Sequence, residues 1–319
     1  MDSLIKVSIV IPVYNVENYI ERCLHSLFKQ TMDDIEYVFV DDASTDNSIR
    51  KVYEILELYP NRKHYAKIVK HNFNQGVAIT RTTGIKVASG EYIIHCDPDD
   101  YVELDMCKLM YTDAKKKDVD IVICDCCVET QTSSKYQGFS FKGSPLEYLR
   151  AGVSTYFSYA SLCNKLIRKR IIEENDIMPY PKCNYGEDLG CVMRILYYAR
   201  SMSNISIPLY HYCRRSTSIT GAQMDLKMYN MRLKLVDNIC IFFEGKGFDT
   251  LCNALKFNAK LAGRHLYVEN EKEWVALYKE CHKDIFKFSD NTLKARLVWW
   301  IALRNVWTYK FMKKVVKNL

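Results

Sequence analysis

The chain has 319 residues, of which 48% are hydrophobic and 26% charged, proportions that are ordinary for a globular protein and exclude wholesale disorder. Twelve glycines and seven prolines exclude a collagen-like chain and long low-complexity linkers. The formal net charge is +7, and residues 221–319 contain 18 Lys and Arg but only 10 Asp and Glu. A basic segment of this kind favours an anionic partner, such as phospholipid, nucleic acid or a phosphorylated protein.

The N-terminus and the cysteines both predict a cytoplasmic protein. Met1–Lys6 leads into a strand-like segment without the charged, apolar and small-residue regions of a secretory leader. The 13 cysteines, an odd number, are typical of reduced thiols. The cluster Cys124, Cys126 and Cys127 lacks CxxC spacing, which favours small apolar side chains around a buried strand over a metal site.

Short apolar runs alternate with helical patterns over the first 125 residues. Continuous, β-branched runs predict strands at Val7–Val13, Ile35–Val40, Ala66–Val69, Glu91–Cys96 and Val119–Cys124. Helical patterns predict helices at Glu17–Lys29, Gln75–Ala88 and Leu104–Lys115, and Ser44-Thr45-Asp46 offers caps for a further helix that runs through Leu58. This order predicts an α/β fold of Rossmann-like type, with a mostly parallel central sheet and helices on both faces.

The remaining chain changes from mixed to helical patterns near residue 220. Cys163–Ile172 predicts a strand or a strand–helix junction, and Glu187–Ala199 predicts a helix. Ile205–Tyr212 predicts a strand, with Pro208 expected at a sheet edge because proline cannot donate a ladder hydrogen bond. Beyond residue 220 only helical patterns follow, at about 222–244, 250–268, 271–287 and 292–317. We therefore predict a domain boundary near residue 220.

Polar residues follow each of the first four predicted strands. They are Pro12–Asn15, Asp41–Ser44, His71–Asn74 and Asp97–Asp100. Ligands of parallel sheets bind outside the carboxyl ends of the strands. The sequence therefore predicts a binding site at this edge.

Three short motifs could take part in binding or catalysis there. In Asp97-Pro98-Asp99-Asp100, carboxylates on a proline-stiffened turn could share Mg²⁺ or Mn²⁺, although Asp and Pro are also common turn residues. Glu187-Asp188 could supply a general base, or could simply cap the helix that it opens. Arg214-Arg215, before a run of hydroxyl residues, could bind a diphosphate or form a solvated loop.

The strings VSIVIPVYNVENYIERCLHSLFKQT, EYVFVDDASTDNS and NFNQGVAITRTTGIKVASGEYIIHCDPDDYV resemble the nucleotide-sugar-binding half of a family 2 glycosyltransferase with the GT-A fold. CNKLIRKRII, YGEDLGCVMRIL and LYHYCRRSTSIT are similar to its acceptor half, as in bacterial capsule, lipopolysaccharide and exopolysaccharide enzymes. The resemblance covers about residues 5–220 and implies a donor half over 1–125 and an acceptor half over 126–220, whereas the separate helical region over 221–319 is predicted from its helical patterns. Two departures are mild: Ala43 stands where glycine is common, and Thr82 where relatives often carry Asn.

The resemblance also implies which residues bind the nucleotide-sugar. They are Pro12, Tyr14, Asn15, Asp41, Asp42, Ser44, Asn74, Gly76, Arg81, Asp97, Arg214, Ser216 and Ser218. Within this set Tyr14 would stack on the base, and Asp41 and Asp42 would bond the uracil or ribose in an order left open. Asn74 and Arg81 would face the ribose and diphosphate. Arg214 and the hydroxyls of residues 216–218 would close over the diphosphate.

For the reaction, the resemblance implies Mn²⁺ or Mg²⁺ bound mainly by Asp99, with Asp97 and Asp100 beside it. Asp188 would be the base, with Glu187 as its neighbour. The expected reaction transfers a sugar, with inversion, from a nucleotide-sugar to a hydroxyl of a glycan or lipid-linked glycan in cell-surface polysaccharide synthesis. We expect the donor to be UDP-linked.

Two other classes of function compete with this one. A sugar nucleotidyltransferase would need a Gly- and basic-rich loop after the first strand, where Pro12–Asn15 stands. A basic membrane- or nucleic-acid-binding module would leave the motifs at Asp97–Asp100 and Glu187-Asp188 unexplained. We therefore expect no nucleic-acid partner.

The C-terminal segment 294–319 contains seven Lys and Arg and no acid. Lys310, Lys313, Lys314 and Lys317 share one helix face, and Trp299, Trp300 and Trp307 lie within the same segment. This pattern fits either an interfacial helix on the anionic inner face of the plasma membrane or a terminal helix that packs its Trp residues on the protein.

Overall fold

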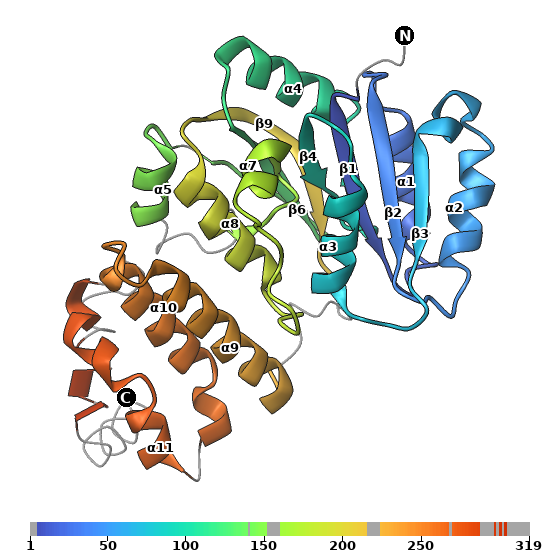
Figure 1. Ribbon diagram of the computed structural model, residues 1–319. Helices are drawn as coiled ribbons and strands as arrows, with labels where there is room; N and C mark the ends of the chain where they lie inside the picture. The colour runs from blue at the N-terminus through green and yellow to red at the C-terminus, as the bar shows by residue number, and fades with distance from the viewer. Residues whose placement is uncertain are drawn as a thin grey trace. The chain divides into compact units, whose positions relative to one another are not determined.

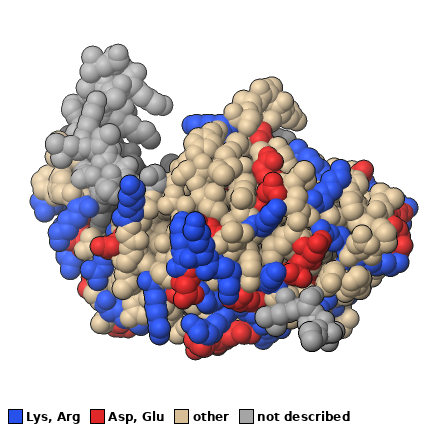
Figure 2. All heavy atoms as spheres, turned by 90° about the horizontal axis from the view of Figure 1, so that it is seen from above, with Lys and Arg blue, Asp and Glu red and all other residues tan. Residues whose placement is uncertain are grey.

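The computed structural model describes residues 5–139, 141–151, 160–215, 224–267 and 270–287, with residues 297, 300, 301, 303 and 304. The chain divides into two compact units (Figure 1). Unit 1 comprises Met1–Leu149 and Phe157–Ala222, and unit 2 comprises Arg150–Tyr156 and Gln223–Leu319. Basic and acidic side chains are interspersed over the face shown in Figure 2.

Unit 1 is built on one mixed sheet. Its strands are β1 (Val7–Val13), β2 (Ile35–Asp41), β3 (Ala66–Lys70), β4 (Tyr92–His95), β5 (Tyr101–Val102), β6 (Ile121–Glu129), β7 (Ser134–Gln137), β8 (Lys165–Arg168) and β9 (Met202–Cys213). They lie in the order β3-β2-β1-β4-β8-β6-β9-β5, and β7 pairs with β6. The first four are parallel, β8 is antiparallel to both its neighbours, and β6 is parallel to β9.

Helices cover both faces of this sheet (Figure 1). They are α1 (Ile20–Phe28), α2 (Ser48–Leu56), α3 (Val77–Val87), α4 (Met106–Lys117), α5 (Pro145–Ala151), α7 (Lys169–Glu174) and α8 (Glu187–Tyr198), and a 3-10 helix, η1 (Pro60–Tyr65), precedes β3. Alternate residues of β1, from Val7 to Val13, pack with the apolar stripes of α1, α2 and α4 in one core cluster. On the other face, Val10 lies under Gly84 of α3. The predicted α/β class with flanking helices is confirmed.

The helix over Ser48–Leu56 has Asn47 as its N-cap, and so begins after the caps predicted at Ser44-Thr45-Asp46. The Asp46 carboxylate accepts hydrogen bonds from the backbone N–H of Ser48 at 2.9 Å and of Glu17 at 2.9 Å. The Asn15 amide oxygen likewise accepts from Thr45 N–H at 2.9 Å. These bonds hold the residues before α2 in a loop that connects the C-terminal ends of β1 and β2. They therefore prevent the helix from starting earlier.

Pro208 lies where β9 is paired with a strand on one side only. Strand β9 lies between β6 and β5 in the sheet, but it pairs with β5 only at Tyr210 and His211. The predicted edge position therefore holds at Pro208, although β9 as a whole is not an edge strand. The register on β6 also jumps from Cys124 opposite Ile205 to Asp125 opposite Pro208, an irregularity that accommodates proline as well.

Unit 2 is helical where the structure describes it. Its elements are α9 (Leu226–Phe243), α10 (Asp249–Ala262), η4 (Arg264–Tyr267), α11 (Glu271–Ala276) and η5 (Lys279–Lys287). The helices predicted at 250–268 and 271–287 are each divided. Lys260, fully buried, donates to the carbonyls of Val275 and Leu277 at 2.8 and 2.7 Å, and these bonds satisfy carbonyls where α11 ends.

The segment 292–317 lies almost wholly outside the described residues, so the two interpretations of its basic pattern stay open. Among the residues that are described, none of the helices is long and apolar enough to cross a membrane.

The close approach of α3 to β1 gives a test of the fold. A Cβ added at Gly84 would lie 2.3 Å from Cγ1 of Val10. We expect Gly84→Ala to destabilise the protein by about 1–3 kcal/mol, because overpacking outweighs the roughly 1 kcal/mol that alanine gains in helix propensity. Urea unfolding measures this, and the double variant with Val10→Ala should lose less than the sum of the two single variants. A Gly84→Ala protein as stable as the wild type would contradict the tight approach.

Candidate active site

The polar residues after β1, β2, β3 and β4 meet at one edge of the sheet. This follows from the parallel order β3-β2-β1-β4, which brings the four carboxyl ends together. Tyr14 is 47% exposed there, and Asn74 is also exposed, so both are available to a ligand. Pro12 is buried within β1, opposite Val40.

The two aspartates after β2 have different surroundings. Asp42 accepts hydrogen bonds from Gln75 N–H at 2.9 Å and Gly76 N–H at 2.8 Å, and it pairs with His71 Nδ1 at 2.7 Å. It therefore shapes the loop that leads into α3. Asp41 accepts one bond, from Ser44 N–H at 2.9 Å.

Three backbone conformations support this edge. Asn15 and Ala43 have φ of 49° and 59°, in the left-handed region, and Ala43 is the position for which the family resemblance implies glycine. Gly76 has φ of 86°, and a Cβ there would lie 2.0 Å from the amide nitrogen of Asn184. Gly76 is therefore required by conformation and by space.

Arg81 is the centre of the charged part of the site. Its side chain is 3% exposed; its Nη2 lies 2.8 Å from Asp97 Oδ1, and its Nε lies 3.3 Å from Glu187 Oε1 and 3.4 Å from Asp188 Oδ1. Burial alone would lower the pKa of Arg81, but the carboxylates of Asp188 and Asp97 outweigh it and raise that pKa. One cation thus joins α3, the turn after β4 and the first turn of α8.

The carboxylates of Glu187 and Asp188, at the start of α8, are surrounded by protein rather than by water. Asp188 accepts a hydrogen bond from Leu162 N–H at 3.0 Å. Burial, together with the charge of Asp188, raises the pKa of Glu187 to about 7, and burial also raises the pKa of Asp188. A carboxylate with a raised pKa beside a fixed cation is chemically suited to accept a proton from a hydroxyl.

The three aspartates after β4 divide into two that face the opening and one that does not. The side chains of Asp97 and Asp99 are 31% and 30% exposed. Asp100 is buried and accepts from Tyr210 Oη at 2.5 Å and from Cys213 N–H at 2.8 Å, and burial raises its pKa to about 7. Its position suits support of the turn rather than contact with a ligand.

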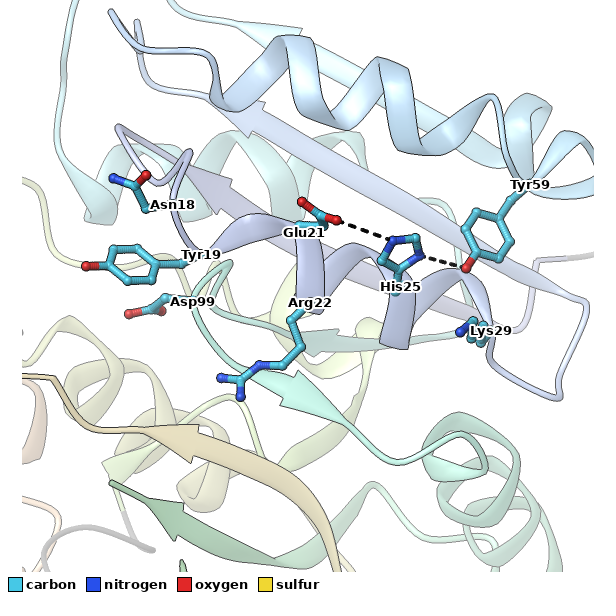
Figure 3. Close-up of a pocket in the computed structure, with 8 residues that line it drawn as sticks. All are labelled: Asn18, Tyr19, Glu21, Arg22, His25, Lys29, Tyr59 and Asp99. Atoms are coloured by element: carbon cyan, nitrogen blue, oxygen red, sulfur yellow. Dashed lines mark hydrogen bonds and ion pairs between the residues drawn. The ribbon is translucent and has the colours of Figure 1, made fainter. Parts of the chain in front are cut away.

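Sequence reasoning named Arg215 as a possible diphosphate ligand but missed its pairing with Asp99 and the other residues around that aspartate. Arg215 pairs with Asp99 at 2.7 Å, and its guanidinium lies 3.4 Å from the centre of the Tyr19 ring. Arg22 lies over Tyr101 at 4.2 Å. A hollow of about 590 Å³ is lined by Asn18, Tyr19, Glu21, Arg22, His25, Lys29, Tyr59 and Asp99 (Figure 3). Exposed Tyr19 and Arg22, three residues apart at the start of an amphipathic helix, were the available signal.

Arg214 is exposed, and its backbone N–H donates to Glu129 O at 2.8 Å. The neighbouring Arg215, rather than Arg214, reaches the aspartates. Ser216 and Ser218 lie outside the described residues.

Comparison with known proteins identifies the family. The model of Glycosyl transferase family 2 matches residues 8–175. The chain belongs to glycosyltransferase family 2. The glycosyltransferase is 34% identical over 249 residues to EpsH of Bacillus subtilis (strain 168), a protein named as a glycosyltransferase, covering 75% of this chain and 69% of EpsH. This membership favours a transferase over the two competing classes.

Two further relatives extend the comparison. The glycosyltransferase is 31% identical over 216 residues to the poly(ribitol-phosphate) beta-glucosyltransferase of Bacillus spizizenii, covering 65% of this chain and 32% of that protein. The crystal structure of S. aureus TarS 1-349 in complex with UDP-GlcNAc superposes with a TM-score of 0.67 at 21% identity, covering 87% of this chain and 81% of that one. This likeness confirms the predicted GT-A fold.

The raised pKa of Glu187 predicts a pH-dependent stability. The pKa rises from 4.5 to about 7 on folding, so the folded glycosyltransferase binds more protons between these values and loses stability as the pH rises through them. Glu187→Gln removes this loss. We expect the variant to gain about 1–3 kcal/mol relative to wild type between pH 5 and pH 8 in urea unfolding. If the stabilities of wild type and Glu187→Gln changed with pH in the same way, Glu187 would not have a raised pKa and the prediction would be contradicted.

Proposed function

We propose that this glycosyltransferase moves a sugar from a UDP-linked donor to a hydroxyl of a glycan or lipid-linked glycan in cell-surface polysaccharide synthesis, with inversion at the anomeric carbon. The observation that carries the proposal is the Arg81 cluster, which holds Asp97 and Asp188 around one cation at the strand edge that also bears Tyr14. The complex of TarS with UDP-GlcNAc and the poly(ribitol-phosphate) glucosyltransferase name support the donor and acceptor classes.

The donor would lie along the carboxyl edge of the sheet. Exposed Tyr14 offers a ring for the base, and Asp41 is the better of the two β2 acids to meet the uracil or ribose, since both oxygens of Asp42 already accept hydrogen bonds. Asn74 is free to face the ribose. Asn15, Ser44 and Gly76 would act by shaping the loops, as Asp42 does.

The residues at the opening fit a divalent cation. Asp97 and Asp99 present partly exposed carboxylates, and hard oxygen donors are what Mg²⁺ and Mn²⁺ prefer. Asp97 and Asp99 would hold the ion, which would stabilise the negative charge of the departing diphosphate. Arg215, with Arg214 beside it, would exchange its contact with Asp99 for the diphosphate oxygens.

Asp188 would accept the proton. The acceptor hydroxyl oxygen forms its bond to the anomeric carbon while the bond from that carbon to the diphosphate oxygen breaks, and the hydroxyl proton passes to the Asp188 carboxylate. Among the described residues, Asp188 Oδ1 and Arg81 Nη1 are buried without a hydrogen-bond partner, which supports a polar ligand at this point. Glu187 would help to hold Arg81 in place.

The acceptor and the location of the enzyme follow from this proposal. A lipid-linked glycan would place the enzyme at the cytoplasmic face of the plasma membrane. The basic segment 294–319 is the candidate contact with anionic lipid.

The first test separates binding from turnover. Binding of a panel of UDP- and GDP-sugars is measured by calorimetry, and turnover is measured by release of the nucleoside diphosphate, each with Mn²⁺ or Mg²⁺. We expect Asp188→Asn to bind the donor normally but to lower kcat by about 10²- to 10⁴-fold. Asp99→Asn should weaken metal-dependent donor binding at least about tenfold, whereas Asp33→Asn, a largely exposed carboxylate, should change neither quantity. If no nucleotide-sugar binds with any metal, the proposal fails.

The second test concerns the ion pair between Arg215 and Asp99. Because the guanidinium competes with a cation for Asp99, Arg215→Met should bind Mn²⁺ alone about two- to fivefold more tightly than wild type, but the donor more weakly. Free Mn²⁺ is measured by electron paramagnetic resonance. Arg22→Met is the matched control, since Arg22 and Arg215 both line a second hollow, and Arg22 contacts Cys213 and the Tyr101 ring rather than Asp99. Equal Mn²⁺ affinities in wild type and Arg215→Met would contradict the competition.

A further inference from the structure

The face of the sheet away from the core cluster carries a group of side chains that the proposed reaction does not use. Cys127 on β6 pairs in register with His211 on β9, and Glu129 follows on the same face of β6. Cys124 and Cys126 point into the core, so the sequence interpretation of all three cysteines as small apolar side chains does not extend to Cys127, which is partly exposed.

The potential ligand atoms of these three residues lie close together. A ring nitrogen of His211, a carboxylate oxygen of Glu129 and Sγ of Cys127 all lie within 4.8 Å of one another. Sulfur, nitrogen and oxygen in one set is typical of borderline divalent metals such as zinc, and differs from the all-oxygen set of Asp97 and Asp99. A thiolate and a carboxylate would balance the charge of such an ion.

Surrounding residues hold the imidazole as a metal site would require. His211 Nε2 lies 2.8 Å from Glu103 Oε1, while Nδ1 lies 2.8 Å from Glu129 Oε1. The ring stacks on Tyr101 with centroids 4.1 Å apart and an interplanar angle of 9°. A histidine that binds a metal through one nitrogen almost always donates its other N–H to a carboxylate, as Glu103 would accept here.

The group has access to solvent. Glu129 borders a hollow of about 600 Å³ that is also lined by Tyr19, Arg22, Thr130, Gln131, Thr132, Cys213, Arg214 and Arg215. Three protein ligands with one side open to such a hollow leave a coordination position for water or a fourth ligand.

We propose that Cys127, Glu129 and His211 form a binding site for a zinc-class divalent cation, separate from the aspartates of the reaction. Glu129 O accepts a hydrogen bond from Arg214 N–H at 2.8 Å, and Cys213 N–H bonds to Asp100 at 2.8 Å. An ion at this site would therefore fix the end of β9, from which Arg215 reaches Asp99.

Cobalt provides the test, because a Co²⁺–thiolate bond has its own near-ultraviolet absorption band. The full chain, stripped with a chelator, is titrated with Co²⁺ and then with Zn²⁺ as a competitor. We expect one Co²⁺ per chain with a thiolate band, which Zn²⁺ removes. Cys127→Ser should abolish the band, and Glu103→Gln should weaken binding about 10- to 100-fold.

Matched variants keep the test decisive. Two control variants should retain the band: Cys126→Ser, which changes the neighbouring cysteine on the core face, and Asp99→Asn, which changes the proposed catalytic cation site. Circular dichroism checks that each variant is folded. Cys127→Ala repeats the key result if Cys127→Ser folds poorly. Absence of a thiolate band, or a band that survives in a folded Cys127 variant, would overturn the proposal; His211 would then only link Glu103 and Glu129 by hydrogen bonds.

Discussion

The buried guanidinium of Arg81 is the interaction on which the rest of the site depends. A single cation comes from α3 and holds Asp97 from the turn after β4 and Glu187 and Asp188 from α8. Three carboxylates near one another would repel, and burial would drive them toward their neutral forms. With Arg81 between them, the carboxylates of Asp97 and Asp188 can lie within one site. The same contact joins segments separated by more than 100 residues of chain.

A second constraint lies in the loops at the strand edge. Asp42 and Asp46 each accept backbone N–H groups from another loop, so that the exits of β1 and β2 and the start of α3 are held together by side chains. Loops fixed in this way lose little further entropy when a ligand binds. Residues that a motif comparison would place on the nucleotide can therefore contribute by positioning others.

The end of β9 is the third element of the site. Asp100 bonds to Tyr210 and to Cys213 N–H, and His211 lies between Glu103 and Glu129. These contacts connect the aspartate-bearing turn directly to the strand that precedes Arg215. Any ligand that moves Arg215 away from Asp99 acts on a segment whose preceding strand these bonds hold in place.

The sequence by itself determined the helices and strands that build the parallel edge, and the family, because strand and helix periodicity and the acid-rich motifs are local properties of the chain; β5, β7 and α5 were not predicted. The insertion of antiparallel β8, the interior position of β9 with its bulge at Pro208, and the contacts of Arg81, Arg215 and His211 were decided only by the tertiary structure. Pairing of this kind joins residues far apart in the chain, and no local pattern states which arginine will lie against which aspartate. Burial follows from the same packing, so the raised pKa of Glu187 and the supporting position of Asp100 could emerge only from the folded chain.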